Sequence, residues 1–93
     1  MKLSWDEAKR QATLVARGLD FALARELFAG LHFTLEDLRK DYGERRFVSA
    51  GTIAWRLCVV VWTPRGPRRH IISLRKANDR EQKRYAKALA QGR

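Results

Sequence analysis

Basic side chains crowd a short stretch of the second half of the chain, with one histidine among them. The basic residues of this stretch and just upstream are Arg45, Arg46, Arg65, Arg68, Arg69, Arg75 and Lys76, with His70 in their midst. Arginine holds phosphate through paired N–H groups, and histidine exchanges protons near neutral pH. The stretch therefore predicts a site that binds a phosphodiester. If the histidine is suitably placed, the site could also cleave the phosphodiester.

The net charge of +10 lies entirely in the second half of the chain. Residues 1–42 contain seven basic and seven acidic side chains, whereas residues 43–93 contain thirteen basic and three acidic ones. A solubilising surface mixes both signs, so this segregation predicts one positive face and a polyanionic partner. RNA fits that partner better than a membrane surface, because the basic stretch lacks an amphipathic anchor.

The predicted strand from Arg68 to Arg75 should present its side chains alternately on two faces. Arg69 and Arg75 would then share one face and His70 the other. We expect the Arg69–Arg75 face to be open and to bind single-stranded RNA. The residues predicted to bind RNA are Arg45, Arg65, Arg68, Arg69 and Lys76. The alternative is a solvated strand edge whose charges discourage aggregation.

Two residues are candidates for proton transfer. Cationic neighbours favour the neutral form of His70, which could then act as a base, although it could also be packed and hydrogen-bonded. Tyr85 lies on a predicted C-terminal helix, where it could pack in the core, stack on a base or donate a proton. The three tryptophans are expected in the core; they are Trp5, Trp55 and Trp62.

Other classes of protein are disfavoured by what the sequence lacks. The lone Cys58 and the two histidines, His32 and His70, do not have the spacing of a metal site, so we expect no metal and no cofactor. No apolar run approaches the roughly 20 residues of a membrane span, and the N-terminus lacks a signal-peptide pattern. The expectation is a cytoplasmic protein without membrane contact, with one domain over residues 1–93.

Local signals predict two helices followed by a strand. Ser4 and Glu7 have the spacing of a capping box, for a helix that runs to about Arg17 before Gly18. Asp20 would cap a second helix that ends at Gly30. Apolar residues then alternate from 31 to 35, which is typical of a half-buried strand. A polar loop from 36 to 43 follows.

Three more strands and a helix complete the predicted fold. The strands run from 47 to 51, 53 to 62 and 68 to 75, with turns at 51–52 and 64–67. The strand containing the apolar run 57–62 should lie in the sheet centre. Asn78 and Glu81 repeat the capping pattern for a helix to about residue 91. This order predicts an α+β fold with a mostly antiparallel sheet of about four strands and helices on one face.

Several short motifs, taken in order, resemble the BrnT toxin family over about residues 3–88. They are Trp5-Asp6, Gly18-Leu19-Asp20-Phe21, Tyr42-Gly43-Glu44-Arg45-Arg46 and Ile71-Ile72-Ser73-Leu74-Arg75-Lys76-Ala77. The resemblance implies a RelE-like fold, RNA cleavage that arrests growth, and a cognate antitoxin with a DNA-binding domain. The toxin–antitoxin complex would bind operator DNA. Carried over by position, the family's arginines fall on Arg46 and Arg75, with Glu44 and Arg65 close by.

Two departures from the family pattern bear on catalysis. Ala16-Arg17-Gly18 stands where Lys-His-Gly is common, with Thr13 in place of the usual upstream asparagine, and His70 stands where an arginine is usual. The leading hypothesis is a metal-independent endoribonuclease toxin, in which Arg46 and Arg75 contact the scissile phosphate and His70, or failing it Tyr85, transfers protons. The alternatives are a non-enzymatic nucleic-acid-binding module and a catalytically weakened subunit that acts through its antitoxin.

Overall fold

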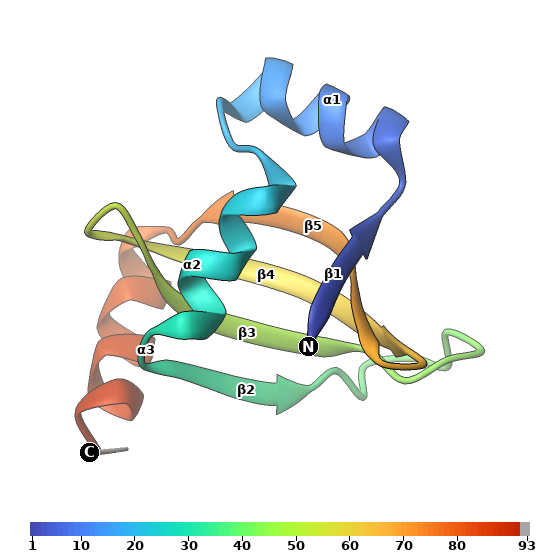
Figure 1. Cartoon of the computed structure of the whole chain (residues 1–93). Helices are drawn as coiled ribbons and strands as arrows, with labels where there is room; N and C mark the ends of the chain where they lie inside the picture. Colours follow the sequence, from blue (N-terminus) through green and yellow to red (C-terminus); the bar gives the residue numbers. More distant parts are fainter. Residues whose placement is uncertain (92–93) are drawn as a thin grey trace.

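The computed structural model describes residues 1–91 and has the predicted α+β architecture. Its elements in chain order are β1 (Lys2–Trp5), α1 (Glu7–Arg17), a short 3₁₀ turn η1 (Phe21–Leu23), α2 (Ala24–Ala29), β2 (His32–Glu36), β3 (Phe47–Ile53), β4 (Arg56–Arg65), β5 (Arg68–Lys76) and α3 (Asp79–Gln91). Figure 1 shows the strands as one twisted sheet, with α1 standing beyond β5.

The described residues form a five-stranded sheet in the order β1-β5-β4-β3-β2, one strand more than predicted. The additional strand is β1, which pairs parallel to β5, whereas the other pairs are antiparallel. The predicted cap at Ser4 is wrong, because Ser4 lies within β1 and the Asp6 side chain accepts the hydrogen bond from the Lys9 N–H. Leu3 and Trp5 pack against the core, so this short strand is anchored by alternate residues.

The central strand is β4, as predicted, and helices cover both faces of the sheet, not one. Val60 is buried with Leu27 of α2 and Phe21 of η1, whereas Val59 is buried with Tyr85 of α3. Because neighbouring residues of a strand point to opposite faces, the two clusters lie on opposite sides of the sheet. We call these sides the α2 face and the α3 face.

A β-bulge changes which side chains of β5 share a face. Val61 pairs with Ser73 and Trp62 pairs with Ile71, so Ile72 is an extra residue in the ladder. Ile71 and Leu74 are consequently both buried on the α2 face although they are three positions apart. The predicted common face of Arg69 and Arg75 is therefore wrong. Arg69 lies on the α2 face, and Arg75 lies on the α3 face.

The turn between β3 and β4 lies at Ala54-Trp55, not at the predicted positions 51–52. Ala54 and Trp55 have φ angles of +48° and +68°, and the Ala54 N–H donates to Glu26 Oε2 of α2 at 2.6 Å. Gly51 is needed inside β3 because a Cβ there would lie 2.9 Å from Leu27 Cγ. Trp55 is 98% exposed at the tip of the turn, so its predicted core position is wrong.

The remaining helix ends follow the local signals. Gly18 ends α1 with a φ of +68°, and the Asp20 side chain accepts from the Ala22 N–H at the start of η1. At α3 the Glu81 N–H donates to Asn78 Oδ1 at 2.8 Å, and the Asn78 N–H donates to Glu81 Oε1 at 3.0 Å. Both hydrogen bonds of the predicted capping box are present. None of the helices within residues 1–91 is long and apolar enough to cross a membrane.

Candidate functional site

Most of the candidate catalytic side chains lie on the α3 face. Thr63 and Arg65 of β4 point to this face because they continue the alternation of Val59 and Val61. His70 pairs with Thr63 and therefore points to the same side. Arg46 does so as well, because it continues the alternation of Val48 in β3.

One group of charged residues lies around His70 on this face, near the end of β4. Glu44 is its centre, with its carboxylate 3.7 Å from Arg65 Nη2 and 3.9 Å from Arg46 Nε. The Arg46 guanidinium lies 4.1 Å from the centroid of the Tyr42 ring. We call His70, Arg46, Arg65 and Glu44 the histidine cluster.

Extending the register of β3 and β4 by one residue places Arg46, which precedes β3, beside Thr63, the residue of β4 that pairs with His70. Thr63 of β4 pairs with His70 on one side, and its Oγ1 donates to the Arg45 carbonyl on the other side at 2.6 Å. Two strand spacings, about 10 Å, therefore separate the backbones of Arg46 and His70. The Arg46 and His70 side chains are long enough for both to contact one phosphate that lies between them.

The environment of His70 favours its neutral form. Burial lowers the pKa of the His70 imidazole, and the positive charge of Arg65 lowers it further. Its Nδ1 lies 2.9 Å from Ser4 Oγ in the neighbouring strand β1. His70 is only partly buried and lies on the face opposite to the core beneath α2. A neutral, partly accessible imidazole can accept a proton near neutral pH.

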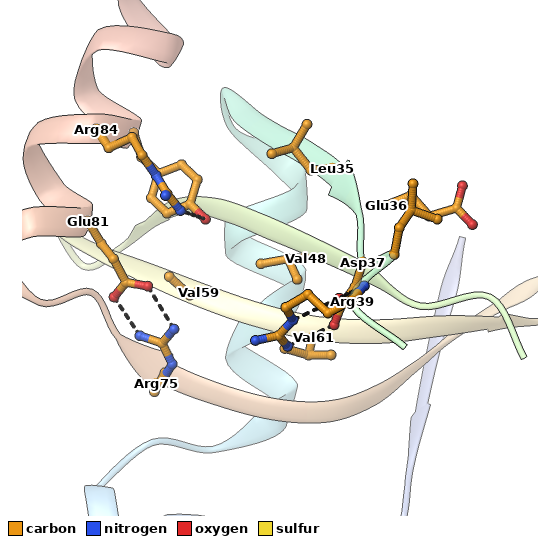
Figure 2. Close-up of a pocket in the computed structure, with 12 residues that line it drawn as sticks. Leu35, Glu36, Asp37, Arg39, Val48, Val59, Val61, Arg75, Glu81 and Arg84 are labelled. Carbon is orange, nitrogen blue, oxygen red and sulfur yellow. Dashed lines mark hydrogen bonds and ion pairs between the residues drawn. The ribbon is translucent and has the colours of Figure 1, made fainter. Parts of the chain in front are cut away.

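A second set of residues lines a groove of about 290 Å³ beside α3, shown in Figure 2. Its apolar wall includes Val48, Val59 and Val61, and its charged residues are Glu36, Asp37, Arg39, Arg75, Glu81 and Arg84. The volume is near the lower end of the range of about 300–1,000 Å³ found for ligand pockets. The groove combines an apolar wall with cationic groups, which suits a base next to a phosphate.

Arg75 is held in this groove by a two-point ion pair with α3. Its Nη1 and Nη2 lie 2.6 Å and 2.8 Å from the two carboxylate oxygens of Glu81 (Figure 2). The Arg75 guanidinium lowers the pKa of Glu81 to about 2, and Glu81 in turn raises the pKa of Arg75. Both terminal nitrogens of Arg75 are thus occupied by a protein carboxylate.

On the opposite side of the groove a buried carboxylate organises the loop after β2. The Asp37 side chain is 3% exposed and accepts hydrogen bonds from Arg39 Nε and Nη2, both at 2.9 Å, and from the Tyr42 hydroxyl at 3.0 Å. The Arg39 guanidinium holds the pKa of Asp37 well below its usual range. This carboxylate fixes the loop that carries Tyr42 towards Arg46.

The predicted catalytic residues fall into two pairs. Arg46 and His70 lie in the histidine cluster, whereas Arg75 and Tyr85 line the groove. Tyr85 is 6% exposed and packs on Phe33, with its hydroxyl 3.3 Å from Arg84 Nη2. Along β4, the partners of His70 and Arg75 are four residues apart, which is about 13 Å.

The predicted RNA-binding residues are divided between the two faces. Arg69 stacks on the α2 face, with its guanidinium 3.9 Å from the centroid of Phe28, and burial lowers its pKa. Arg45 is exposed and forms a two-point ion pair with Glu36 at 3.0 and 3.1 Å. The other three are Arg65 in the histidine cluster, Arg68 near the Leu3 carbonyl, and Lys76, exposed at the end of β5.

Sequence reasoning missed Ser4, Asp37, Arg39 and Thr63 as parts of these arrangements. The spacing of Ser4 and Glu7 predicted a helix cap at Ser4 and not a strand residue. Asp37 lies in a polar loop that has no periodic pattern. The alternation of Thr63 with the valines of β4 was the one available signal. Within residues 1–91 there is no group of three or more histidine, cysteine, aspartate or glutamate residues that could hold a metal ion.

Residues 5–81 match a family model described as ribonuclease toxin, BrnT, of type II toxin-antitoxin system. The matched range includes Arg46, His70 and Arg75, and it ends before Tyr85. No protein of curated function matches the chain.

Proposed function

Because the chain belongs to the BrnT family of ribonuclease toxins of type II toxin–antitoxin systems, we propose that it cleaves RNA at the histidine cluster by a metal-independent reaction. A toxin of this class has RNA as its substrate and a cognate antitoxin as its partner. The observation that carries the proposal is that Arg46 and His70 lie at one level of one sheet face, on either side of Thr63.

In the proposed reaction His70 takes the proton of a ribose 2′-hydroxyl. The 2′-oxygen then forms a bond to the adjacent phosphorus, and the bond from phosphorus to the 5′-oxygen breaks. The leaving 5′-oxygen takes a proton from the imidazolium or from water. The products are a 2′,3′-cyclic phosphate and a 5′-hydroxyl, and the proton transfers and bond changes balance without a metal ion or cofactor.

The arginines of the histidine cluster, together with Arg68 of β5, would stabilise the negative charge of the phosphorane. Arg46, Arg65 and Arg68 point to this end of the α3 face, where Glu44 is the opposing carboxylate in contact with two of them. With Lys9 and Asp6, which also act on His70, four positive charges against two negative charges leave a net charge of +2 beside a neutral His70. That excess favours a doubly charged phosphorane more than a singly charged diester.

The groove beside α3 would hold a neighbouring nucleotide of the substrate and not the scissile phosphate. Arg39, Arg75 and Arg84 face three carboxylates there, Glu36, Asp37 and Glu81, so the lining has no net charge. Because Glu81 pairs with both terminal nitrogens of Arg75, we assign Arg75 no phosphate contact and place it with Tyr85 in the wall that holds the nucleotide. This revises the sequence-based hypothesis that Arg46 and Arg75 contact one phosphate.

We further propose that the toxin acts in the cytoplasm. Its antitoxin covers the α3 face with an acidic or amphipathic segment. The antitoxin also contains a DNA-binding domain, through which the complex binds operator DNA. The support for the covering segment is the concentration of positive charge in residues 43–93.

A single-turnover cleavage assay tests the proposal. Purified toxin is mixed with single-stranded RNA in the presence of a chelator, and the RNA ends are analysed for a 2′,3′-cyclic phosphate. We expect His70→Ala to lower the cleavage rate about a hundred- to ten-thousandfold and Arg46→Ala about a hundredfold. Arg25→Ala, which removes an exposed arginine of α2, is the matched control and should cleave normally.

Wild-type rates for folded His70→Ala and Arg46→Ala would overturn the assignment of the site. Loss of wild-type cleavage in the presence of chelator would overturn the metal-independent mechanism.

A further inference from the structure

The N-terminal strand supplies a hydrogen-bonding partner to His70. Ser4 is the register partner of His70 in the parallel pair β1–β5, and its Oγ lies 2.9 Å from His70 Nδ1. We propose that Ser4 is a positioning residue, which holds the imidazole in one orientation for reaction with RNA. The inference rests on the proposed role of His70 as a base, and it extends the site to a residue that precedes the matched range 5–81.

The orientation follows from the geometry of the ring. An imidazole that accepts the 2′-hydroxyl proton at Nε2 needs the lone pair of that atom, so its own proton must be on Nδ1. With that tautomer, Nδ1 donates to Ser4 Oγ, and Nε2 lies on the far side of the ring from β1. The Ser4 hydroxyl can accept the hydrogen bond that this tautomer donates, and the contact keeps Nε2 turned towards the substrate.

The backbone around Ser4 is fixed well enough for this role. The β1 strand is bound to β5 by pairs from Lys2 to Trp5, and its side chains at Leu3 and Trp5 pack against the core. Ser4 is thereby directed to the α3 face, towards His70. Because the residues before and after Ser4 both pack against the core, the Ser4 side chain has little freedom to move away from His70.

No charged group near His70 replaces this contact. The charged residues that affect the pKa of His70 come from every neighbouring element: Asp6 before α1, Lys9 in α1, Glu44 in the loop after β2, and Arg65 in β4. They act through their charge, and among the described residues the hydrogen bond to the ring comes from Ser4. Charge sets how readily His70 is protonated, whereas Ser4 sets the orientation of its ring.

The test uses Ser4→Ala, Ser4→Val and Ser4→Thr. Valine removes the hydroxyl but favours a strand, and threonine retains the hydroxyl. We expect alanine and valine to lower kcat about ten- to a hundredfold with little change in KM, because the ring is no longer oriented. They should also move the acid limb of the pH–rate profile. Threonine should restore both properties.

The contact is read directly from the ¹⁵N chemical shifts of the His70 ring, without any cleavage assay. The Nδ1 shift should change in Ser4→Ala and Ser4→Val, which remove the hydrogen-bonding partner, and should be retained in Ser4→Thr. Ser49→Ala is the control for a merely structural hydroxyl, because Ser49 Oγ is hydrogen-bonded to Thr34 and Trp62 in the sheet. It should lower the melting temperature and leave the His70 shifts unchanged.

The role of Ser4 would be overturned if folded Ser4→Ala and Ser4→Val had unchanged ring shifts and unchanged kcat. This conclusion would hold for any cleavage rate of His70→Ala. Normal cleavage by His70→Ala would instead overturn the proposed function. The ring shifts separate these two failures, because they report on the Ser4–His70 contact independently of catalysis.

Discussion

Glu81→Gln should weaken the fold and strengthen RNA binding at the same time. The glutamate forms a two-point ion pair with Arg75, and the substitution keeps the size of the side chain and an oxygen for the Asn78 N–H of the helix cap. What it removes is the negative charge that neutralises Arg75. The released guanidinium is then free to bind a phosphate of the substrate.

The loss of stability can be worked from the pKa of Glu81. A carboxyl whose pKa falls from 4.5 to about 2 on folding would contribute about 3 kcal/mol if the whole effect were retained. Glu81 is 15% exposed, but Arg75 is 41% exposed, so solvent screens the pair. We therefore expect Glu81→Gln to lower the free energy of unfolding by about 1–2 kcal/mol at pH 7.

The difference between wild type and variant should depend on pH in a defined window. Because the pKa of Glu81 is lower in the folded protein, its contribution is complete above about pH 4.5 and is lost as the pH falls through about 2. Urea unfolding of both proteins between pH 7 and pH 2 measures this. A difference that persists undiminished at pH 2 would contradict the electrostatic origin.

RNA binding gives the second readout. One additional phosphate contact should steepen the plot of log affinity against log salt concentration by about 0.7 for single-stranded RNA. Asp79→Asn is the matched control, because it removes an acid from the same helical turn without touching Arg75. A salt dependence that is equal in wild type and Glu81→Gln would refute the reasoning that Glu81 keeps Arg75 from the substrate.

Four further outcomes are expected. The cleavage rate should fall at acid pH with an apparent pKa below 6.5, because burial lowers the pKa of His70, and a midpoint above 6.5 in a pH–rate profile would contradict this. Replacing Ala54-Trp55 by Asn-Gly should raise the free energy of unfolding in urea by about 1 kcal/mol, because both positions have positive φ; no gain would count against strain in the turn. Arg69→Ala should lower the free energy of unfolding by about 1 kcal/mol, because the stacking on Phe28 is lost, and should leave the salt dependence of RNA binding unchanged. A flatter salt dependence would show that Arg69 contacts RNA. Cross-links to the antitoxin should fall on the α3 face, and cross-links confined to residues 1–30 would contradict the argument from charge.

Local signals predicted most of the fold because they act within a few residues. Gly18, Asp20 and the pair Asn78–Glu81 end or begin helices as their types require, since each satisfies backbone groups next to it. The central position of β4 followed from its apolar side chains on both faces. These features need no knowledge of distant parts of the chain.

The candidate site was harder to predict because it depends on register between strands. The bulge opposite Val61-Trp62 moves Arg69 and Arg75 to different faces, and alternation along one strand does not reveal it. Ser4 has the spacing of a helix cap, and only its pairing with β5 shows that it belongs to the sheet. Arg46, His70 and Arg75 were identified as candidates, whereas their division into two arrangements required the structure.

The pairing of β1 with β5 joins two strands that are far apart in the sequence, and β1 is synthesised before β5. Ser4 and His70 are 66 residues apart, so the N-terminal residues have no strand to join until the ribosome has made β5. Contacts over such a separation form late in folding, after the local hairpin of β3 and β4. A growing chain that already contains α1, α2 and the first antiparallel strands therefore still lacks the strand that brings His70 to the histidine cluster.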